Sequence, residues 1–395
     1  MNPDFVKPRY DSGGFAGTPT RIKEAFASNQ YDAVVLFFVD AFGWRFFERF
    51  QDSPFLKRFA KQGKIEKLTS QFPSTTAAHV TTMHTGLPVG VSGVHEWIYY
   101  EPHADRVIAP LLFSFSGTKE RDTLDAKRVK PEQIYPVGTF YPALKAMGVE
   151  SFNFGLRDYS PSTYSKVVMN GSKILSYKTL SEALINLRLL LERQTQPTFI
   201  HLYFDKIDAV AHEHGPNSPQ VEAEIETFLL MMEHYFDRIF AGNKRILFLM
   251  TADHGMCEVD PQTTIYLNTD ASFSGFDKFI RTNRRGFPIV PAGSARDMFL
   301  YIKHERVDEA HTFLEKRLTG KADVVKTETL IQEGYFGPSV SERFLERVGN
   351  LVILPYRYQS VWWYEKEKFE MKFLGHHGGL TPQEMETVLY SLEVG

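Results

Sequence analysis

The sequence predicts a doubly wound α/β protein: a mostly parallel sheet with helices on both of its faces, interrupted by an inserted α+β cap. Short apolar runs at residues 33–39, 198–204 and 245–250 are typical of strands buried on both faces, as in parallel sheets. Helix-like segments at residues 180–194 and 219–240 lie between these runs and carry apolar side chains at helical spacing. Alternating strands and helices predict this architecture, in which ligands bind beyond the carboxyl ends of the strands.

The stretch from residue 261 to residue 355 has a different pattern. Arg296–Ile302 is strand-like and Glu305–Leu318 is helix-like. A further strand is predicted at Ser360–Tyr364, where we expect the chain to return to the core. The expected division is a core made of residues 1–260 and 356–395, with residues 261–355 inserted as a cap subdomain.

The net charge of the chain argues against two kinds of binding partner. Lys and Arg number 45 against 48 Asp and Glu, which gives a net charge of −3. A chain this close to neutral is not built to coat a nucleic-acid scaffold or an anionic membrane, so neither partner is expected. The longest apolar run, residues 33–39, is far shorter than the roughly 20 residues of a membrane-spanning helix.

The single cysteine, Cys257, excludes a disulfide within the chain and a cysteine-rich metal site. Any metal ion must then be held by His, Asp and Glu side chains. Residues 1–10 lack the apolar segment of a signal peptide. Together with the single thiol, this feature leads us to expect a cytoplasmic location.

Polar residues follow three of the predicted strands at their carboxyl ends, and Asp205 is the one that follows residues 198–204. Asp40 comes directly after residues 33–39 and can aim its carboxylate at a metal ion, although Asp is also a common helix N-cap. Asp253 and His254 follow the run at residues 245–250 and are closed by a glycine. A buried charged pair at this position needs a partner, which a metal ion would supply.

A second kind of signal is a run of hydroxyl residues. The segment Phe72–His79 places Ser74, Thr75 and Thr76 after a proline and before a helical stretch that ends in Thr85-Gly86. Such residues bring a side-chain oxygen and free backbone N–H groups to a helix N-terminus, which suits an anion and an activated nucleophile. By itself, an ordinary Ser/Thr helix cap explains the segment at least as well.

Two further segments carry histidines. Asp208 and His212 are four residues apart, so on a helix they face the same way and can share a cation, with His214 nearby. The alternative is a solvated loop with a stray histidine. Near the end of the chain, glycines follow the pair His376-His377, and glycines let the backbone approach a ligand closely.

Taken in order, these motifs resemble the alkaline phosphatase superfamily and, within it, the type I phosphodiesterase/nucleotide pyrophosphatase family. Each motif is weak or moderate alone, but five in the right order make a strong signal. The resemblance covers residues 30–260 and 370–390. It implies an alkaline phosphatase-like fold and a metal-dependent hydrolase of phosphoric esters that works through a phospho-threonine intermediate at a two-metal site.

The resemblance also implies roles for individual residues. The family's nucleophile lies ten residues before the glycine of the Thr-Gly pair, here Gly86, which points to Thr76, with Thr75 as the neighbouring alternative. Asp208, His212 and His377 resemble the ligands of one metal ion, and His376 is the alternative to His377. A second set of residues resembles the ligands of the other metal ion: Asp40, Asp253, His254 and the Thr76 oxygen.

An oxygen and nitrogen ligand set without sulfur suits Zn²⁺ and tolerates Mn²⁺, and the resemblance favours zinc. Two divalent ions about 4 Å apart can serve both the attacking and the leaving oxygen of an in-line phosphoryl displacement. The expected cofactors are therefore two divalent metal ions, with Zn²⁺ favoured over Mn²⁺.

One position departs from the family pattern. The family carries an asparagine about 21 residues after the nucleophile, where it binds a phosphoryl oxygen, and the residue here is Trp97. The indole N–H of a tryptophan is its one hydrogen-bond donor, so His95 or a backbone N–H could make this contact instead. We therefore take Trp97 and His95 as candidate substrate-binding residues. The aromatic cluster of Trp97, Tyr99 and Tyr100 could also stack on a flat group or simply pack.

The favoured function is hydrolysis of phosphodiester or nucleotide pyrophosphate bonds in a small-molecule substrate. A phosphomonoesterase and a phosphonate hydrolase of the same superfamily are the alternatives within the enzymes. Sulfatases use a formylglycine made from Cys or Ser, and the related phosphoglycerate mutases use serine, so Thr76 argues against both. A different class, a non-catalytic binding protein stabilised by metals, is disfavoured because every expected ligand position is filled.

Overall fold

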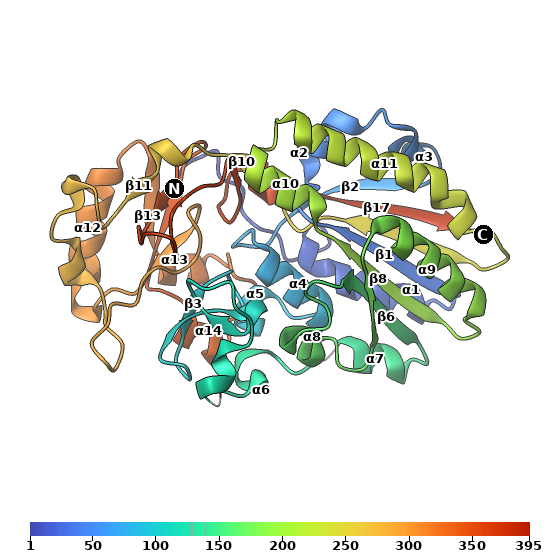
Figure 1. Cartoon of the computed structure of the whole chain (residues 1–395), viewed down its shortest axis with the longest axis horizontal. Helices are drawn as coiled ribbons and strands as arrows, with labels where there is room; N and C mark the ends of the chain where they lie inside the picture. The colour runs from blue at the N-terminus through green and yellow to red at the C-terminus, as the bar shows by residue number, and fades with distance from the viewer. Residues whose placement is uncertain (128, 139) are drawn as a thin grey trace.

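A seven-stranded sheet forms the centre of the larger of two lobes (Figure 1). The computed structural model describes residues 1–127, 129–138 and 140–395. In order across the sheet, the strands are β2 (Lys64–Thr69), β17 (Glu386–Val394), β9 (Ile246–Thr251), β1 (Ala33–Val39), β8 (Thr198–Phe204), β6 (Glu150–Leu156) and β7 (Lys173–Tyr177). All neighbours from β9 to β7 pair in parallel, whereas β17 runs antiparallel to both β9 and β2. This arrangement confirms the predicted mostly parallel sheet.

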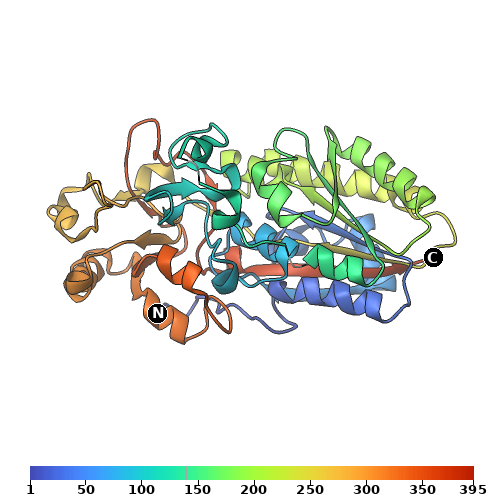
Figure 2. The same ribbon diagram turned by 90° about the horizontal axis from the view of Figure 1, so that it is seen from below.

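Helices cover both faces of the sheet (Figure 2). One face packs against α1 (Thr18–Ala27), α4 (Thr76–Thr85), α7 (Phe140–Ala146) and α8 (Thr163–Val168). The other packs against α2 (Trp44–Phe50), α3 (Pro54–Gln62), α9 (Leu180–Arg193), α10 (Lys206–His214) and α11 (Pro219–Ile239). The two helices predicted from apolar spacing are confirmed as α9 and α11.

The central strand β1 shows why the apolar runs are continuous. All seven of its residues are buried. Val34, Leu36 and Phe38 face the helices around α4, and the residues between them face the helices around α11. Because both faces of the strand are covered, no position in it requires a polar side chain. Asp40, the next residue on the α4 side, is the first to point beyond the sheet.

The smaller lobe contains a three-stranded antiparallel sheet with the order β12 (Met298–Leu300), β14 (Leu351–Pro355) and β13 (Ala322–Lys326). Beside it lie α12 (Val307–Leu318), α13 (Thr327–Gln332) and α14 (Glu342–Arg347). The predicted strand and helix of this region correspond to β12 and α12. A second antiparallel sheet, β3 (Tyr99–Glu101), β4 (Arg106–Ala109) and β5 (Ser114–Phe115), comes from an earlier part of the chain.

The chain returns to the central sheet in its last residues. The strand predicted at residues 360–364 is the short β15 (Val361–Trp362), and it pairs with β11 (Ile265–Tyr266) rather than with the central sheet. The return is made by β16 (Gly375–His376), which pairs with β10 (Cys257–Glu258), followed by α15 (Pro382–Met385) and β17. The predicted division of the chain at residues 260 and 356 stays a prediction.

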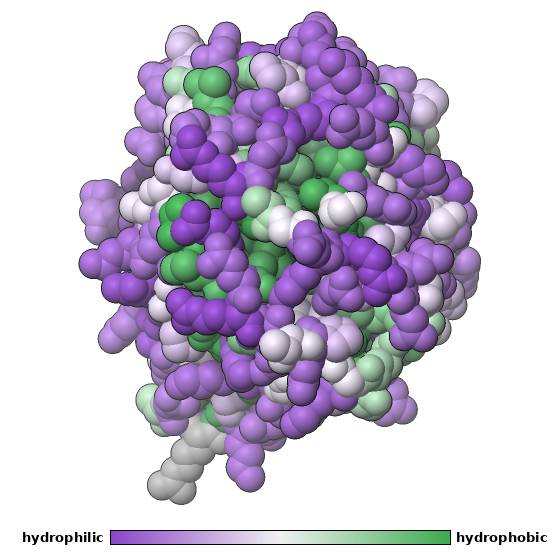
Figure 3. Space-filling model, turned by 90° about the vertical axis from the view of Figure 1, so that its right-hand side faces the viewer, coloured by the Kyte–Doolittle hydropathy of each residue, from purple (hydrophilic) through white to green (hydrophobic). Residues whose placement is uncertain are grey.

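The two ends of the central sheet have different surroundings. The carboxyl ends of its parallel strands face the smaller lobe, whereas the chain's C-terminus lies at the opposite edge (Figure 1). That opposite edge shows hydrophilic residues around a central area of apolar ones (Figure 3). The short helices α5 (Val89–Ser92) and α6 (Pro131–Ile134) lie near the junction of the lobes. No helix in the described part of the chain combines the length and apolar character that crossing a membrane requires.

A buried ion pair joins the smaller lobe to the returning chain. Arg296 donates from Nε and Nη2 to the two carboxylate oxygens of Glu384, each over 2.9 Å, and both side chains are fully buried. Arg296 also donates to the carbonyl of Tyr356 over 2.9 Å. Glu384 in turn accepts from the backbone N–H of Gly379 over 3.0 Å. The pair therefore fixes the glycine loop that follows His377.

We expect Arg296→Met to lower the free energy of unfolding by about 3–5 kcal/mol, because it leaves the Glu384 carboxylate buried without its cation. Denaturant unfolding followed by circular dichroism measures this change. The matched control is Arg306→Met, which removes the exposed pair with Glu309 and should cost less than about 1 kcal/mol. Equal losses in the two variants would contradict the structural role of the buried pair.

Candidate active site

Side chains from several segments meet at the carboxyl edge of the central sheet. Asp40 directly follows β1, and Asp253 with His254 follows the neighbouring β9. Because parallel strands end at the same edge of a sheet, residues that follow them lie close together. The other members of the cluster are Asp208 and His212 on α10, Thr76 at the start of α4, and His377 after β16.

Asp40, Asp253, His254 and Thr76 form one half of this cluster. The His254 Nε2 atom lies 3.5 Å from Asp40 Oδ1 and 3.3 Å from Asp253 Oδ2. Thr76 Oγ1 lies 3.2 Å from the same Nε2 atom and 3.5 Å from Asp40 Oδ2. The four predicted ligands of one metal ion are therefore within reach of a common point.

Asp208, His212 and His377 form the other half. The Nε2 atoms of the two histidines are 3.1 Å apart, and they lie 3.5 and 3.6 Å from Asp208 Oδ1. The rings of His377 and His254 stack at a centroid distance of 3.6 Å, so the two halves adjoin. His254 also has a ligand atom within 4.8 Å of those of Asp208 and His377, which makes it the shared edge of the two groups.

The orientation of the three imidazoles turns their Nε2 atoms towards the centre of the cluster. Each Nδ1 atom faces a backbone carbonyl: His212 that of Gly375 over 2.8 Å, His377 that of Ser74 over 2.9 Å, and His254 that of Gly255 over 3.0 Å. A carbonyl oxygen accepts hydrogen bonds and donates none, so each Nδ1 carries the proton and each Nε2 keeps its lone pair. This is the arrangement that metal-binding histidines adopt.

The carboxylates of the cluster have buried oxygens without hydrogen-bond partners: Oδ1 of Asp40, Oδ1 of Asp208 and Oδ2 of Asp253. Burial, together with the nearby charges of Asp253 and Asp208, raises the pKa of Asp40 well above its usual range. Burial likewise raises the pKa of Asp253 to about 7. Unpaired buried carboxylates are costly, and a cation held by these oxygens and the free Nε2 atoms would satisfy them. The residues present therefore fit a metal site.

Neighbouring groups hold the two strand-end carboxylates in place. Tyr203, on β8, donates from its hydroxyl to Asp40 Oδ2. Asp253 Oδ1 accepts from the backbone N–H groups of Ala41 over 3.1 Å and His254 over 3.0 Å. In each carboxylate, one oxygen accepts hydrogen bonds from these protein groups, and the other has no hydrogen-bond partner.

The structure distinguishes the two candidate nucleophiles by position. Thr76 is the first residue of α4 and its hydroxyl faces the cluster, as described above. Thr75 is the N-cap of the same helix, and its hydroxyl lies beside the buried carboxyl of Glu96 instead. The helix ends at Gly86, which adopts a left-handed conformation with φ of 72°. Thr76, rather than Thr75, is the hydroxyl that the fold brings to the acids and histidines.

The two candidate histidines also differ. His377 is the one whose Nε2 contacts Asp208 and His212. The Nδ1 atom of His376 accepts from the backbone N–H of His377 over 2.9 Å, and its ring lies edge-on to His212 at a centroid distance of 5.4 Å. His376 therefore lies beside the cluster rather than in it. His214, at the end of α10, is partly exposed and pairs with Glu213 over 4.0 Å.

Two pockets meet at the cluster, and Trp97 borders both of them. Its side chain is 45% exposed, so it is available to a substrate. His95 is placed differently from our expectation: it is fully buried and stacks on Tyr99 at 4.7 Å, with Phe299 and Phe344 against its ring. It borders neither pocket, so this geometry does not support the predicted contact between His95 and the substrate.

Sequence reasoning did not single out several residues that surround the cluster. Tyr203 belongs to an apolar run in the sequence. Because side chains alternate between the two faces of β8, its hydroxyl reaches Asp40. Tyr159 donates to Asp205 Oδ2 over 3.0 Å, at the end of β8. Glu96 is fully buried beside Thr75 and borders the second pocket, and burial raises its pKa to about 8. Asp205, by contrast, stood out in the sequence because it directly follows a predicted strand.

The fold and this cluster of acids, histidines and a helix-terminal threonine are those of a metal-dependent hydrolase of the alkaline phosphatase superfamily. The model of the type I phosphodiesterase/nucleotide pyrophosphatase family matches residues 34–380, which run from β1 to the glycine loop after His377. The chain belongs to this family and is a hydrolase that acts on phosphoric ester bonds. A search among curated protein sequences found no match.

Solved structures share the fold at low sequence identity. Murine ectonucleotide pyrophosphatase/phosphodiesterase 5 is 16% identical with a TM-score of 0.67, covering 91% of this chain and 87% of that chain. The human protein of the same name is 15% identical with a TM-score of 0.64 and the same coverage. Phosphonoacetate hydrolase from Sinorhizobium meliloti 1021 is 16% identical with a TM-score of 0.62, covering 92% and 90% of the two chains.

Proposed function

We propose that this protein hydrolyses phosphoric diesters, including nucleotide pyrophosphate bonds, with Thr76 as the nucleophile. In the first step Thr76 Oγ1 would form a bond to phosphorus while the bond from phosphorus to one substituent oxygen breaks. The resulting phospho-threonine keeps the second substituent, and water then releases it as a phosphomonoester. The observation that carries the proposal is the position of the Thr76 hydroxyl, at the start of α4 and 3.2 Å from His254 Nε2.

The protein's own groups suit this reaction. The first backbone N–H groups of α4 have no partner within the helix, so they can stabilise the oxygens of a phosphoryl group in front of Thr76. The Thr76 hydroxyl points towards Asp40 Oδ2, 3.5 Å away, and Tyr203 fixes the orientation of that carboxylate.

The metal ions proposed for the site are two Zn²⁺ ions, with Mn²⁺ as the alternative. Asp208, His212 and His377 would hold one, and Asp40, Asp253, His254 and Thr76 the other. When bound, such ions supply positive charge that lowers the pKa of a hydroxyl and stabilises phosphoryl oxygens. The support for the two ions is the pair of adjoining donor groups without sulfur, each with an unpartnered buried carboxylate oxygen.

Two pockets at one nucleophile favour a diester over a monoester. Thr76, Trp97 and Asp208 border both pockets, so a phosphorus atom in front of Thr76 could place one substituent in each. A monoester would use only one of them. The inactive threonine-to-alanine variant of the murine structural relative was solved in complex with AMP, and the bacterial relative in complex with phosphonoacetate. These ligands define the substrate classes to compare with diesters.

The test is to assay the purified protein with added Zn²⁺ or Mn²⁺ on bis-p-nitrophenyl phosphate, p-nitrophenyl phosphate and phosphonoacetate. We expect kcat/KM for the diester to exceed that for the monoester by at least about tenfold, because the monoester leaves one pocket empty. Mass spectrometry of an acid-quenched reaction should find the p-nitrophenyl phosphoryl group on the peptide that contains Thr76. Higher kcat/KM for phosphonoacetate than for the diester would assign the protein to the phosphonate hydrolases instead.

A further inference from the structure

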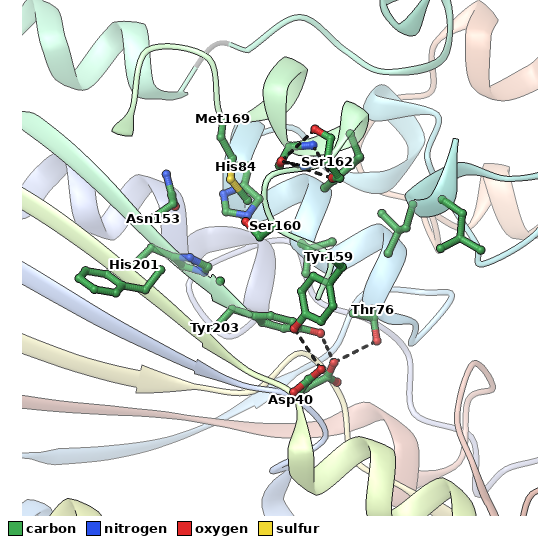
Figure 4. Close-up of a pocket in the computed structure, with 18 of the residues that line it drawn as sticks. Asp40, Thr76, His84, Asn153, Tyr159, Ser160, Ser162, Met169, His201 and Tyr203 are labelled. Atoms are coloured by element: carbon green, nitrogen blue, oxygen red, sulfur yellow. Dashed lines mark hydrogen bonds between the residues drawn. The ribbon is translucent and has the colours of Figure 1, made fainter. Parts of the chain in front are cut away.

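The pocket beside Asp40 and Thr76 is long and follows α4 into the protein (Figure 4). Thr76, Val80 and His84 all border it, and their spacing of four residues puts them on one face of the helix. The eight residues from Thr76 to His84 correspond to about 12 Å along the helix axis. The pocket therefore extends two turns of α4 beyond the nucleophile.

The walls of this pocket are mostly apolar or aromatic. They come from α4, from the loop and helix that follow β6, and from the segment before residue 113. The side chains of this kind that line it are Val80, Leu111, Leu112, Tyr164 and Met169. Such walls suit the uncharged body of an ester substituent.

The far end of the pocket is polar. Asn153 on β6 and His201 on β8 are register partners on neighbouring strands, and both border the pocket on the face covered by α4. His84 packs against His201 with a ring centroid distance of 4.9 Å. In Figure 4, these residues lie at the end of the pocket away from Asp40 and Thr76.

The hydrogen bonds at this end are incomplete. The Tyr141 hydroxyl donates to Asn153 Oδ1 over 2.7 Å and lies 2.6 Å from His84 Nδ1, which must therefore be the donor of that second bond. His201 has no such neighbour. It is 1% exposed, and neither of its ring nitrogens has a hydrogen-bond partner.

A buried imidazole whose ring nitrogens make no hydrogen bonds is energetically unfavourable. A buried polar group that lacks a hydrogen bond costs about 1–3 kcal/mol, so a ligand that supplies the bond gains the corresponding affinity. Burial lowers the pKa of His201 to about 3, which keeps the ring neutral at physiological pH. A neutral imidazole offers one donor and one acceptor. The ring can therefore pair with an uncharged group that carries both.

We propose that this pocket binds one substituent of the ester along its length, and that His201 hydrogen-bonds an uncharged polar group at the far end of that substituent. This inference rests on the proposed function. A nucleoside is the substituent class that fits, because its flat base suits the aromatic walls and carries donors and acceptors on its outer edge. The charged residues that border the pocket do not favour an anionic end group, since Asp40, Asp205 and Asp208 are acidic and Arg121 is exposed.

The test compares two esters with the same leaving group, the p-nitrophenyl ester of thymidine 5′-monophosphate and ethyl p-nitrophenyl phosphate. The ethyl group is too short to reach His201. We expect His201→Phe, which keeps the ring but removes its hydrogen bonds, to lower kcat/KM for the nucleotide ester about tenfold or more, mainly through KM. The rate for the ethyl ester should change less than about twofold. His201→Gln, which keeps a donor and an acceptor, should recover part of the loss.

His95→Phe is the matched control. His95 is also buried with both ring nitrogens unpartnered, but it does not border this pocket. Its replacement should leave the ratio of the two rates unchanged. Equal losses on both esters in His201→Phe, or no loss on either, would overturn the inference.

A binding measurement separates this inference from the proposed function. If the wild-type protein turned over neither ester, the proposed function would be contradicted. Titration calorimetry of the Zn²⁺-loaded protein with AMP would still test the pocket, because AMP carries the nucleoside without needing to react. We expect AMP to bind His201→Phe about tenfold more weakly than the wild type, and inorganic phosphate to bind both equally. Equal affinities for AMP would overturn the inference.

Discussion

Thr76→Ala is expected to lower kcat about 10³-fold or more while the content of metal ions stays near two per chain. The substitution removes the oxygen that attacks phosphorus, and removing a nucleophile from an enzyme with a covalent intermediate has effects of at least this size. The carboxylates and imidazoles of the cluster are untouched, so metal binding should persist through Asp40, Asp253 and His254. Steady-state kinetics on bis-p-nitrophenyl phosphate, with metal analysis of the same sample, measures both quantities.

Thr75→Ala is the matched control, because it removes a neighbouring hydroxyl that faces Glu96 rather than the cluster. It should retain kcat within about tenfold of the wild type, because the Thr75 side chain makes no cap hydrogen bond to α4 and lies away from the cluster. Thr76→Ser, which keeps a hydroxyl at the same place, should keep measurable turnover. Full activity in Thr76→Ala together with an inactive Thr75→Ala would move the nucleophile to Thr75.

The central sheet could be predicted because burial on both faces leaves a signal in local sequence. β1 and β8 read as unbroken or nearly unbroken apolar runs, and both are buried except at the half-buried Tyr203 of β8. β17 left no such signal, since Glu386, Ser391 and Glu393 interrupt its apolar residues. Its place between β9 and β2 depends on pairing with segments more than 130 residues away, which a local pattern does not encode.

In the site, too, residues next to strands could be predicted from local sequence, whereas residues placed by long-range packing could not. Asp40 and Asp253 could be proposed from the sequence because they lie one and two residues after a strand, and strand ends meet at one edge of a parallel sheet. His95 shows the limit of counting along the chain. Its position near the family's asparagine suggested a substrate contact, but the fold packs its ring against Phe299 and Phe344 of the smaller lobe.

His201 shows the opposite case, a residue whose sequence context hides its chemistry. It stands in the middle of the run at residues 198–204, where a local reading takes it for a core position. Only the register between β6 and β8 reveals that Asn153 lies beside it on the same face, and only the path of α4 shows that a pocket reaches both.

Removing the metal ions should destabilise the protein, and more at pH 8 than at pH 5. Ions present at 100 to 1,000 times their dissociation constants stabilise the fold by about 3–4 kcal/mol each. Without them, the buried oxygens of Asp40, Asp208 and Asp253 have no partner. Thermal unfolding at pH 5, 6, 7 and 8, with and without a chelator and with metal analysis of each sample, measures the effect.

The pH dependence follows from the raised pKa of Asp253, which is about 7 in the folded chain without metal ions against about 4 in an unfolded chain. Between these values the folded state holds a proton at Asp253 that the unfolded state has lost, so the contribution of Asp253 to the stability of the metal-free protein falls as pH rises and levels off above pH 7. Protons also compete with metal ions for the same ligands, which makes the metal contribution smaller at pH 5. Asp253→Asn lacks this titration, so the metal-free variant should be more stable at pH 7 relative to pH 5 than the metal-free wild type is. An equal Tm with and without metal ions at pH 8 would show that the cluster does not hold them. Asp40 and Asp253 are buried beside His254, and their carboxylates cannot be ionised there without a cation at no cost.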